Sequence, residues 1–308
     1  MNELLIIAPI AAVILLGRLL GTSGAVSPQT FRETNKILYW ISIPALLLRL
    51  TVRANLDALG GWNLFFAVYG TYFLLPLIAF GIGRLFKEDR KRLAISALTS
   101  MRSNQVFMGI PAVSIAMGNP GLEALSLFLA MSLVGYHVIS IASSQLVITR
   151  ELSVRSLLGT ISKVVRNPMV CACLVGILCS SLGFREFPGW IDTTLKVLGD
   201  IGTGLALLAL GASIKVVSLK GVFRSTWRDC TIKLFLHPLT LFLFFSLLPV
   251  EKTMMQVVVF CSAMPVAVNS LVVAQGMGMD EHYAAELIAV STMLSVFTLP
   301  LWIRFLGI

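Results

Sequence analysis

The chain has 308 residues, of which 57% are hydrophobic and only 13% charged, and its mean hydropathy is +0.89. Because a soluble domain carries about a quarter charged residues, this composition excludes a soluble globular protein and indicates an integral membrane protein. The net charge of +9 does not indicate nucleic acid binding, since the basic residues stand in short clusters between long apolar runs, as in the cytoplasmic loops of membrane proteins.

The apolar runs predict about ten membrane-spanning helices, because a crossing of ~30 Å of hydrocarbon takes roughly 17–25 residues. Lipid cannot satisfy backbone polar groups, so runs of this length are helices and not barrel strands. The first run carries Asn2 and Glu3 where a cleavable signal peptide would be basic, and we expect it to stay in the membrane. The predicted spans are residues 3–20, 36–52, 63–84, 94–117, 122–147, 168–183, 195–214, 231–248, 254–276 and 284–305.

The basic residues between the spans predict the orientation of the chain. Most of them fall within residues 18–36, 84–92, 150–166 and 215–228, which share one side of the bilayer if the spans alternate. The positive-inside rule puts that side in the cytoplasm. We therefore expect a multi-pass protein of the cell inner (cytoplasmic) membrane with its N-terminus outside.

Weak internal similarity divides the chain into halves, residues 1–150 and 151–308. NKILYWISIPALLLRL (35–50) aligns with LKVLGDIGTGLALLAL (195–210), and the proline of the fourth span corresponds to that of the ninth. With about five spans in each half, a duplication must insert its second copy upside down. The predicted fold is an all-α membrane protein of ten helices in two inverted five-helix repeats, and paired interrupted spans point to a central transport site.

The fourth span, SALTSMRSNQVFMGIPAVSIAMG, places polar residues ahead of a helix break. Pro111 lacks an amide donor and Gly109 loosens the backbone before it, so we expect the helix to open there. The freed backbone groups and the polar side chains would then bind a small anion. Alternatively, Arg102 snorkels to the membrane surface and the amides hold helices together. The polar residues are Arg102, Ser103, Asn104 and Gln105.

The ninth span, FCSAMPVAVNSLVVAQGMG, repeats this pattern without a charged residue. Asn269 follows its proline whereas Asn104 precedes its own, so inverted helices that cross at the midplane would bring the two asparagines together. Substrate contacts are therefore predicted at Arg102, Ser103, Asn104, Gln105, Pro111, Pro265, Asn269 and Ser270.

Few other ionisable residues lie within the spans, and most have more than one interpretation. Asp200 either caps the start of its helix or takes part in ion coupling. His237 precedes Pro238 and either satisfies carbonyls that the proline frees or couples transport to an ion. His137 and Glu286 are packed polar groups or proton carriers. Lys233, close to a basic loop, is expected to snorkel.

The sequence lacks the common enzyme signatures, including His-Glu-x-x-His, Gly-x-Ser-x-Gly and the Walker phosphate loop. We therefore expect no enzymatic activity, and without a nucleotide site any active transport would be secondary. No cofactor or metal is expected, and the sequence does not show whether protons or sodium drive transport.

The chain resembles the auxin efflux carrier family, which includes the plant PIN-type auxin exporters and bacterial malonate and malate carriers. The matching motifs follow the family order over nearly the whole chain. They are RSNQVFMGIPAV (102–113), NPMVCACLVGIL (167–178), LGDIGTGLALLALGAS (198–213), FLHPL (235–239), AMPVAVNSLVVAQ (263–275) and STMLSVFTLPLW (291–302).

The resemblance implies an architecture related to bile-acid symporters and sodium/proton antiporters. In it, helices 1, 2, 6 and 7 form a scaffold and a homodimer contact, and helices 3–5 and 8–10 form a mobile core with crossed, broken helices 4 and 9. It also implies an elevator-type secondary transporter that holds a small organic anion, such as a carboxylate, an auxin-like acid, malonate or malate, at the crossing. The alternatives are an anion-binding membrane sensor and a passive channel. Gly204 departs from the proline that many members carry, and the short connection between the halves lacks the regulatory loop of plant exporters.

Overall fold

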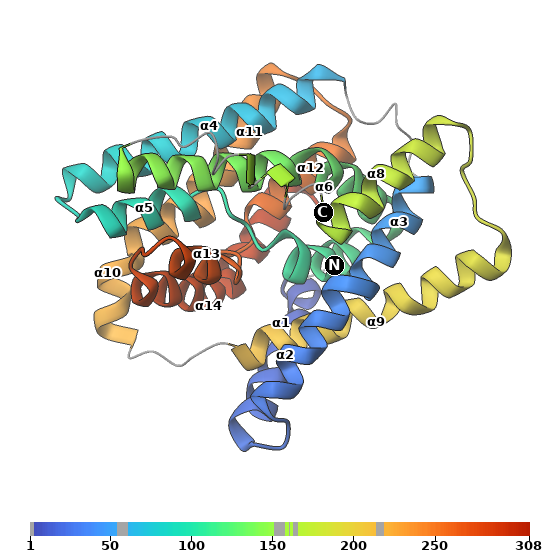
Figure 1. Cartoon of the computed structure of the whole chain (residues 1–308), viewed down its shortest axis with the longest axis horizontal. Helices are drawn as coiled ribbons and strands as arrows, with labels where there is room; N and C mark the ends of the chain where they lie inside the picture. The colour runs from blue at the N-terminus through green and yellow to red at the C-terminus, as the bar shows by residue number, and fades with distance from the viewer. Residues whose placement is uncertain (1–2, 54–60, 151–157, 160, 163–165, 214–218) are drawn as a thin grey trace.

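The structure is a computed structural model, and it describes residues 3–53, 61–150, 158–159, 161–162, 166–213 and 219–308 (Figure 1). Nearly all of these residues are helical, and the one extended pairing among them is an antiparallel bridge between Ser103 and Val266. The prediction of an all-α membrane protein is confirmed. Five helical stretches in the described part are long and apolar enough to cross a membrane: Trp62–Leu85, Gln105–Thr149, Gly189–Ala212, Val222–Leu247 and Glu281–Leu306.

The described residues form helices and short π-helical turns. In chain order they are α1 (Glu3–Ser23), α2 (Pro28–Ile37), η1 (Leu38–Ser42), α3 (Ile43–Arg53), α4 (Trp62–Leu85), α5 (Arg90–Thr99), η3 (Gln105–Gly109), α6 (Ile110–Thr149), α8 (Pro168–Ser181), α9 (Gly189–Ser213), α10 (Leu219–Thr231), η4 (Ile232–Leu236), α11 (His237–Leu247), α12 (Lys252–Ser262), α13 (Ser270–Gly276) and α14 (Glu281–Leu306).

Several predicted spans consist of more than one element. The span predicted at 94–117 divides into α5, a non-helical stretch, η3 and the start of α6, and the span at 254–276 divides into α12, a second non-helical stretch and α13. Conversely, α6 joins parts of two predicted spans, and its backbone is non-helical only at Gly118 (φ 61°, ψ −151°). Glycine adopts such a positive φ without the steric strain of other residues, so it allows the chain to turn there.

Helices α1, α3, α8 and α9 pack together on one side of the molecule (Figure 1). The backbones of α1 and α9 touch at two glycines, because a Cβ on Gly17 would meet the carbonyl of Leu208 and a Cβ on Gly211 would meet that of Ile14. Small residues let helices approach this closely in a membrane, where lipid supplies no hydrophobic drive for association.

The same group of helices is tied together by polar contacts between α3 and α9. Arg49 binds Asp192 through two hydrogen bonds of 2.8 and 3.0 Å, and Arg53 reaches the same carboxylate at 2.9 Å. A fork-to-fork arginine–carboxylate pair fixes orientation as well as distance. The predicted scaffold helices therefore share an extensive interface, with close backbone contact at one end and ion pairing at the other.

Helices α4, α5 and α10–α14 form the opposite side, and α6 contacts both groups (Figure 1). Tyr69 on α4 donates to the carbonyl of Met131 on α6 at 3.1 Å, and the indole of Trp302 on α14 donates to the carbonyl of Leu234 at 2.9 Å. Buried aromatic groups with satisfied polar tips are typical of such packed interiors.

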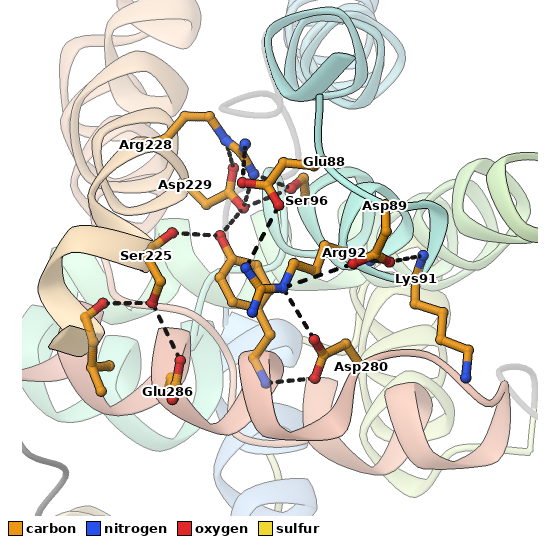
Figure 2. Close-up of polar contacts among 12 residues, drawn as sticks. Glu88, Asp89, Lys91, Arg92, Ser96, Ser225, Arg228, Asp229, Asp280 and Glu286 are labelled. Carbon is orange, nitrogen blue, oxygen red and sulfur yellow. Dashed lines mark hydrogen bonds and ion pairs between the residues drawn. The ribbon is translucent and has the colours of Figure 1, made fainter. Parts of the chain in front are cut away.

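Charged residues at one end of α5, α10 and α14 form an ion-pair cluster (Figure 2). Arg228 binds both oxygens of Asp229 at 3.0 Å and Glu88 at 3.1 Å. Arg92 lies 3.2 Å from Asp280, which caps the first turn of α14. The cluster joins three helices of one side to each other through matched charges. Its members are Glu88, Arg92, Ser96, Arg228, Asp229, Asp280 and Tyr283.

Candidate anion-binding site

Two non-helical stretches, residues 100–104 and 263–269, meet in the interior of the molecule. The amide of Asn104 donates to the carbonyl of Pro265 at 2.8 Å, and the amide of Ala267 donates to the carbonyl of Arg102 at 2.9 Å. Backbone groups freed by the two helix breaks thus satisfy one another, as they must away from water. We refer to these two stretches as the crossing.

The position of the first break differs from the prediction. Pro111 does not open the helix, because the π-helical turn η3 runs directly into α6 and the chain stays helical through the proline. Local π-helical adjustment can compensate for the amide that a proline lacks in a membrane helix. Gly109 is also helical, at the end of η3. The chain leaves the helix earlier, after Thr99, and Pro111 is buried without lining the cavity described below.

Arg102 is completely buried at the crossing, with 0% of its surface exposed. Its Nε donates to Ser270 Oγ at 3.1 Å, its Nη1 to Ser140 Oγ at 3.0 Å and its Nη2 to Asn269 Oδ1 at 2.9 Å. The guanidinium carbon lies 4.6 Å from the ring centre of Tyr136. The interpretation of Arg102 as a snorkelling residue is therefore wrong.

All of these partners are uncharged, so the crossing does not neutralise the guanidinium. Among the residues that the structure describes, no carboxylate forms an ion pair with Arg102. A buried charge without a counter-charge carries a large desolvation penalty. The site is therefore electrostatically suited to an anion.

The amide side chains beside Arg102 have unused hydrogen-bonding groups. Asn104 is buried and its Nδ2 has no partner, while Gln105 donates weakly to Tyr72 Oη at 3.4 Å and its Oε1 has none. Asn269 is exposed and Ser270 buried, and both accept from Arg102 as described above. The buried Nδ2 of Asn104 is an unsatisfied hydrogen-bond donor, and a carboxylate oxygen could accept from it.

A cavity of about 560 Å³ opens between the crossing and the side of the molecule that contains α8 and α9. Arg102, Ser103, Asn104 and Asn269 form part of its wall, and Pro265 and Ser270 do not. Most of the remaining lining is apolar or aromatic, with a few polar side chains, as in ligand pockets generally. The lining from α2, η1 and α9 includes Lys36, Tyr39, Trp40, Ala206 and Leu210.

Lys233 is a second fully buried cation at the crossing, and the prediction that it snorkels is wrong. Its Nζ donates to Ser103 Oγ at 2.7 Å and to the carbonyl of Ser262 at 2.6 Å, and lies 3.1 Å from His237 Nδ1. His237 therefore faces Lys233 and not the carbonyls near Pro238. The side chain of Ser103 thus contacts Lys233, whereas the guanidinium of the neighbouring Arg102 binds Ser140, Asn269 and Ser270.

The other predicted coupling residues lie in different places. His137 lines the cavity and its Nδ1 lies 2.9 Å from the carbonyl of Leu133. Asp200 is exposed in the middle of α9, where it pairs with Lys196 at 2.6 Å, so it is not a helix cap. Glu286 accepts from Ser225 at 3.4 Å beside the ion-pair cluster, away from the cavity.

The sequence did not identify Lys233 as a residue of the crossing, nor Tyr136 and Lys36 as residues of the cavity wall. Tyr136 lies within an apolar run and carries no pattern that distinguishes it, although its hydroxyl donates to the carbonyl of Ser103 at 3.2 Å. Lys36 was counted with the cytoplasmic loops. The one available signal for Lys233 was its spacing of four residues from His237, which places both on one helix face.

Similarity to known proteins covers nearly the whole chain. A family described as "Membrane transport protein" matches residues 4–303. The chain is 21% identical over 296 residues to a protein of Rhizobium meliloti (strain 1021) with the name "Putative malonate transporter", covering 95% of this chain and 92% of that protein.

Two further relatives have names that specify no substrate. The chain is 22% identical over 302 residues to the Escherichia coli (strain K12) protein "Uncharacterized transporter YfdV", covering 96% of this chain and 95% of that one. It is 23% identical over 301 residues to "Uncharacterized transporter MJ1031" of Methanocaldococcus jannaschii, covering 94% of each.

Proposed function

Because the chain belongs to the membrane transport protein family, that of the auxin efflux carriers, we propose that it is a secondary carrier that moves a small organic carboxylate through the cavity at the crossing. The protein is a multi-pass membrane transporter and not an enzyme. The carboxylate, the elevator mechanism and the sites of contact are the proposal.

The observation that carries the proposal is the isolated charge of Arg102. The guanidinium is fully buried, lies on the cavity wall and has only neutral partners among the described residues. Asn104, whose buried Nδ2 has no hydrogen-bond partner among the described residues, lines the same cavity. A carboxylate would both balance the charge and accept from the amide, whereas a neutral solute would do only the second.

The arrangement of the helices supports an elevator mechanism. The cavity lies between the crossing and the side formed by α1, α3, α8 and α9, and it is lined from both. In the proposed mechanism the second side, with α4, α5 and α10–α14, moves the anion past the first. Ten spans in two inverted five-helix repeats, with domains at 1–150 and 151–308, belong to this proposal.

Malonate is the first substrate to test, because one relative bears its name and because the buried guanidinium of Arg102 on the cavity wall has no counter-charge among the described residues. An auxin-like acid such as indole-3-acetate is the second, because aromatic and apolar side chains form much of the cavity wall. We further propose residence in the cytoplasmic membrane with the N-terminus outside, and a homodimer through the scaffold helices.

Countertransport in proteoliposomes tests the function. Vesicles loaded with unlabelled malonate or indole-3-acetate should take up the corresponding labelled acid, and uptake should saturate and depend on the internal acid. Binding without flux would indicate a sensor, and flux that neither saturates nor exchanges would indicate a channel. Either result contradicts the carrier.

A further inference from the structure

We propose that Lys233 and His237 form a proton-binding pair that carries one proton with each anion, so that the protein is an anion–proton symporter. This inference rests on the proposed function, since it requires that an anion crosses the membrane at the crossing. It assigns a coupling site that lies behind the substrate cavity and not within it, because neither residue lines that cavity.

Lys233 connects both halves of the crossing. It lies on the π-helical turn η4, and its Nζ donates to Ser103 in the first non-helical stretch and to the carbonyl of Ser262, where α12 ends just before the second. Turns of π-helix frequently mark functional positions. A change in the charge of this amine would therefore change the strength of its hydrogen bonds to both arms of the crossing.

Among the residues that the structure describes, no carboxylate forms an ion pair with Lys233. Asp229 lies one helical turn earlier, on α10. Its carboxylate oxygens accept hydrogen bonds from Arg228, Ser96 and Tyr283 (Figure 2).

The groups that face the pair from the other packed elements are uncharged, apart from Arg102 beyond Ser103. From α12 comes the Cys261 thiol, from α4 comes Tyr72, whose ring centre lies 6.5 Å from that of His237, and α14 contributes Trp302, which donates to Leu234.

The geometry satisfies the hydrogen bonds of both protonation states. As an ammonium, Lys233 has three donors and three acceptors: Ser103 Oγ, the Ser262 carbonyl and His237 Nδ1. As a neutral amine it keeps two donors for the oxygens and accepts from His237 Nδ1–H, provided that the imidazole changes tautomer. His237 Nε2 is buried without a partner, so it is free to carry a hydrogen in one state and a lone pair in the other.

Charge balance explains why a proton would travel with the anion. The guanidinium of Arg102 stays charged, whereas the amine of Lys233 can lose its proton. The empty carrier, with a neutral amine, holds one net positive charge at the crossing. A bound malonate dianion would reverse that to one negative charge, and a proton on Lys233 brings the loaded crossing to neutrality. The neutral state is the least expensive to move through a low-dielectric interior.

The step itself is simple. A proton from the solution on one side binds the lone pair of the Lys233 amine when the anion binds, and it returns to the solution on the other side when the anion leaves. No covalent bond between heavy atoms forms or breaks.

Labelled malonate uptake driven by a pH gradient tests the proposal. Proteoliposomes are clamped at zero membrane potential with equal potassium on both sides and valinomycin, and the pH is kept between 7 and 8 so that malonate stays a dianion. With one proton per anion, one pH unit should concentrate malonate about tenfold. Saturable exchange without such accumulation would overturn the coupling and leave the carrier intact, whereas absence of exchange would contradict the proposed function.

A substitution locates the coupling site. Lys233→Met keeps a similar volume, and we expect it to retain malonate exchange and to lose the accumulation that the pH gradient drives. Lys196→Met, at an exposed lysine of α9, is the matched control and should behave as wild type. If Lys233→Met does not fold, Lys233→Gln serves instead, and the wild-type experiment stands by itself. Accumulation by a folded Lys233 variant would place the proton elsewhere.

Discussion

Arg102 and Arg228 are both buried, yet their electrostatic surroundings are opposite. Arg228 binds two carboxylates, Asp229 and Glu88, within the ion-pair cluster of Figure 2. Arg102 has two hydroxyls, one amide oxygen and an aromatic ring. The first charge is balanced by the protein itself and so contributes to holding helices together. The second is left for a ligand to balance, and this difference separates a structural cation from a binding one.

The largest effect on stability is expected from a substitution at Asp229. Asp229→Ala would leave Arg228 buried beside only one carboxylate, and loss of one partner of a buried pair costs about 3–5 kcal/mol in the free energy of unfolding. Denaturant or thermal unfolding of the purified protein in detergent measures this loss. Asp200→Ala, which removes an exposed partner of Lys196, is the control and should change stability by about 1 kcal/mol or less. Equal effects would show that burial of the pair does not matter.

Arg102→Gln should weaken ligand binding and have little effect on stability. Hydrogen bonds to a charged group contribute about 1.5–3 kcal/mol, so malonate affinity should fall roughly tenfold to a hundredfold. The ligand-free protein should lose little stability, because the substitution also removes an uncompensated charge. Affinity is read from the rise in unfolding temperature on adding malonate.

The size of the anion's charge sharpens this test. If Arg102 acts as a counter-charge, its loss should weaken the binding of dianions more than that of monoanions, and an equal loss for both would indicate a structural role. Arg185→Gln, at an exposed arginine, should leave both affinities unchanged.

Asn104→Ala should reduce malonate exchange by about tenfold, since it removes one donor from the site, a change of about 1–2 kcal/mol. Expression and unfolding temperature should stay close to wild type, because Nδ2 has no hydrogen-bond partner among the described residues. Asn269→Ala should reduce exchange as well, since it removes an acceptor of Arg102. Asn119→Ala, at an exposed asparagine, is the control, and normal exchange in both site variants would remove the amides from the site.

The smallest effect is expected at the edge of the ion-pair cluster. Burial of the Asp280 carboxyl acts to raise its pKa, but the amide of Tyr283 and the guanidinium of Arg92 outweigh this and hold the pKa below its usual value. A carboxyl with a lowered pKa stabilises the folded state at neutral pH, and this contribution is lost as the pH falls below about 3.9.

Asp280→Asn should therefore reduce stability at pH 7 by about 0.5–2 kcal/mol, the range for a helix N-cap, or by less if the amide caps equally well. The difference from wild type should vanish in acid. A difference that persists there would show that the charge of Asp280 is not its cause.

Several features of this site follow from the sequence because they disturb a regular pattern. A run of polar residues from Arg102 to Gln105 inside an apolar span identifies the first arm of the crossing, and a proline in a corresponding place identifies the second. The contact between Asn104 and Pro265 is what two such arms would make.

Other features depend on where a helix starts and what packs around it, and a linear pattern does not contain this information. Pro111 does not break its helix because the π-helical turn η3 runs directly into α6 around it, and Asp200 is no cap because α9 begins at Gly189. Lys233 lies near a basic loop in sequence, but the path of η4 turns its side chain inward to Ser103. Whether an ionisable side chain is buried depends on the tertiary structure, and burial is what rules out snorkelling for both Arg102 and Lys233.

The backbone bridge at the crossing also sets the order in which the protein acquires its site during synthesis. Arg102 and Asn269, which share a hydrogen bond, are separated by 167 positions along the chain. A nascent chain that has inserted only its first half contains Arg102 but none of the backbone or side-chain partners that Ala267, Asn269 and Ser270 supply. The guanidinium of Arg102 gains these partners only after the second half of the chain has been inserted. Completion of the anion site is therefore one of the last events in biogenesis.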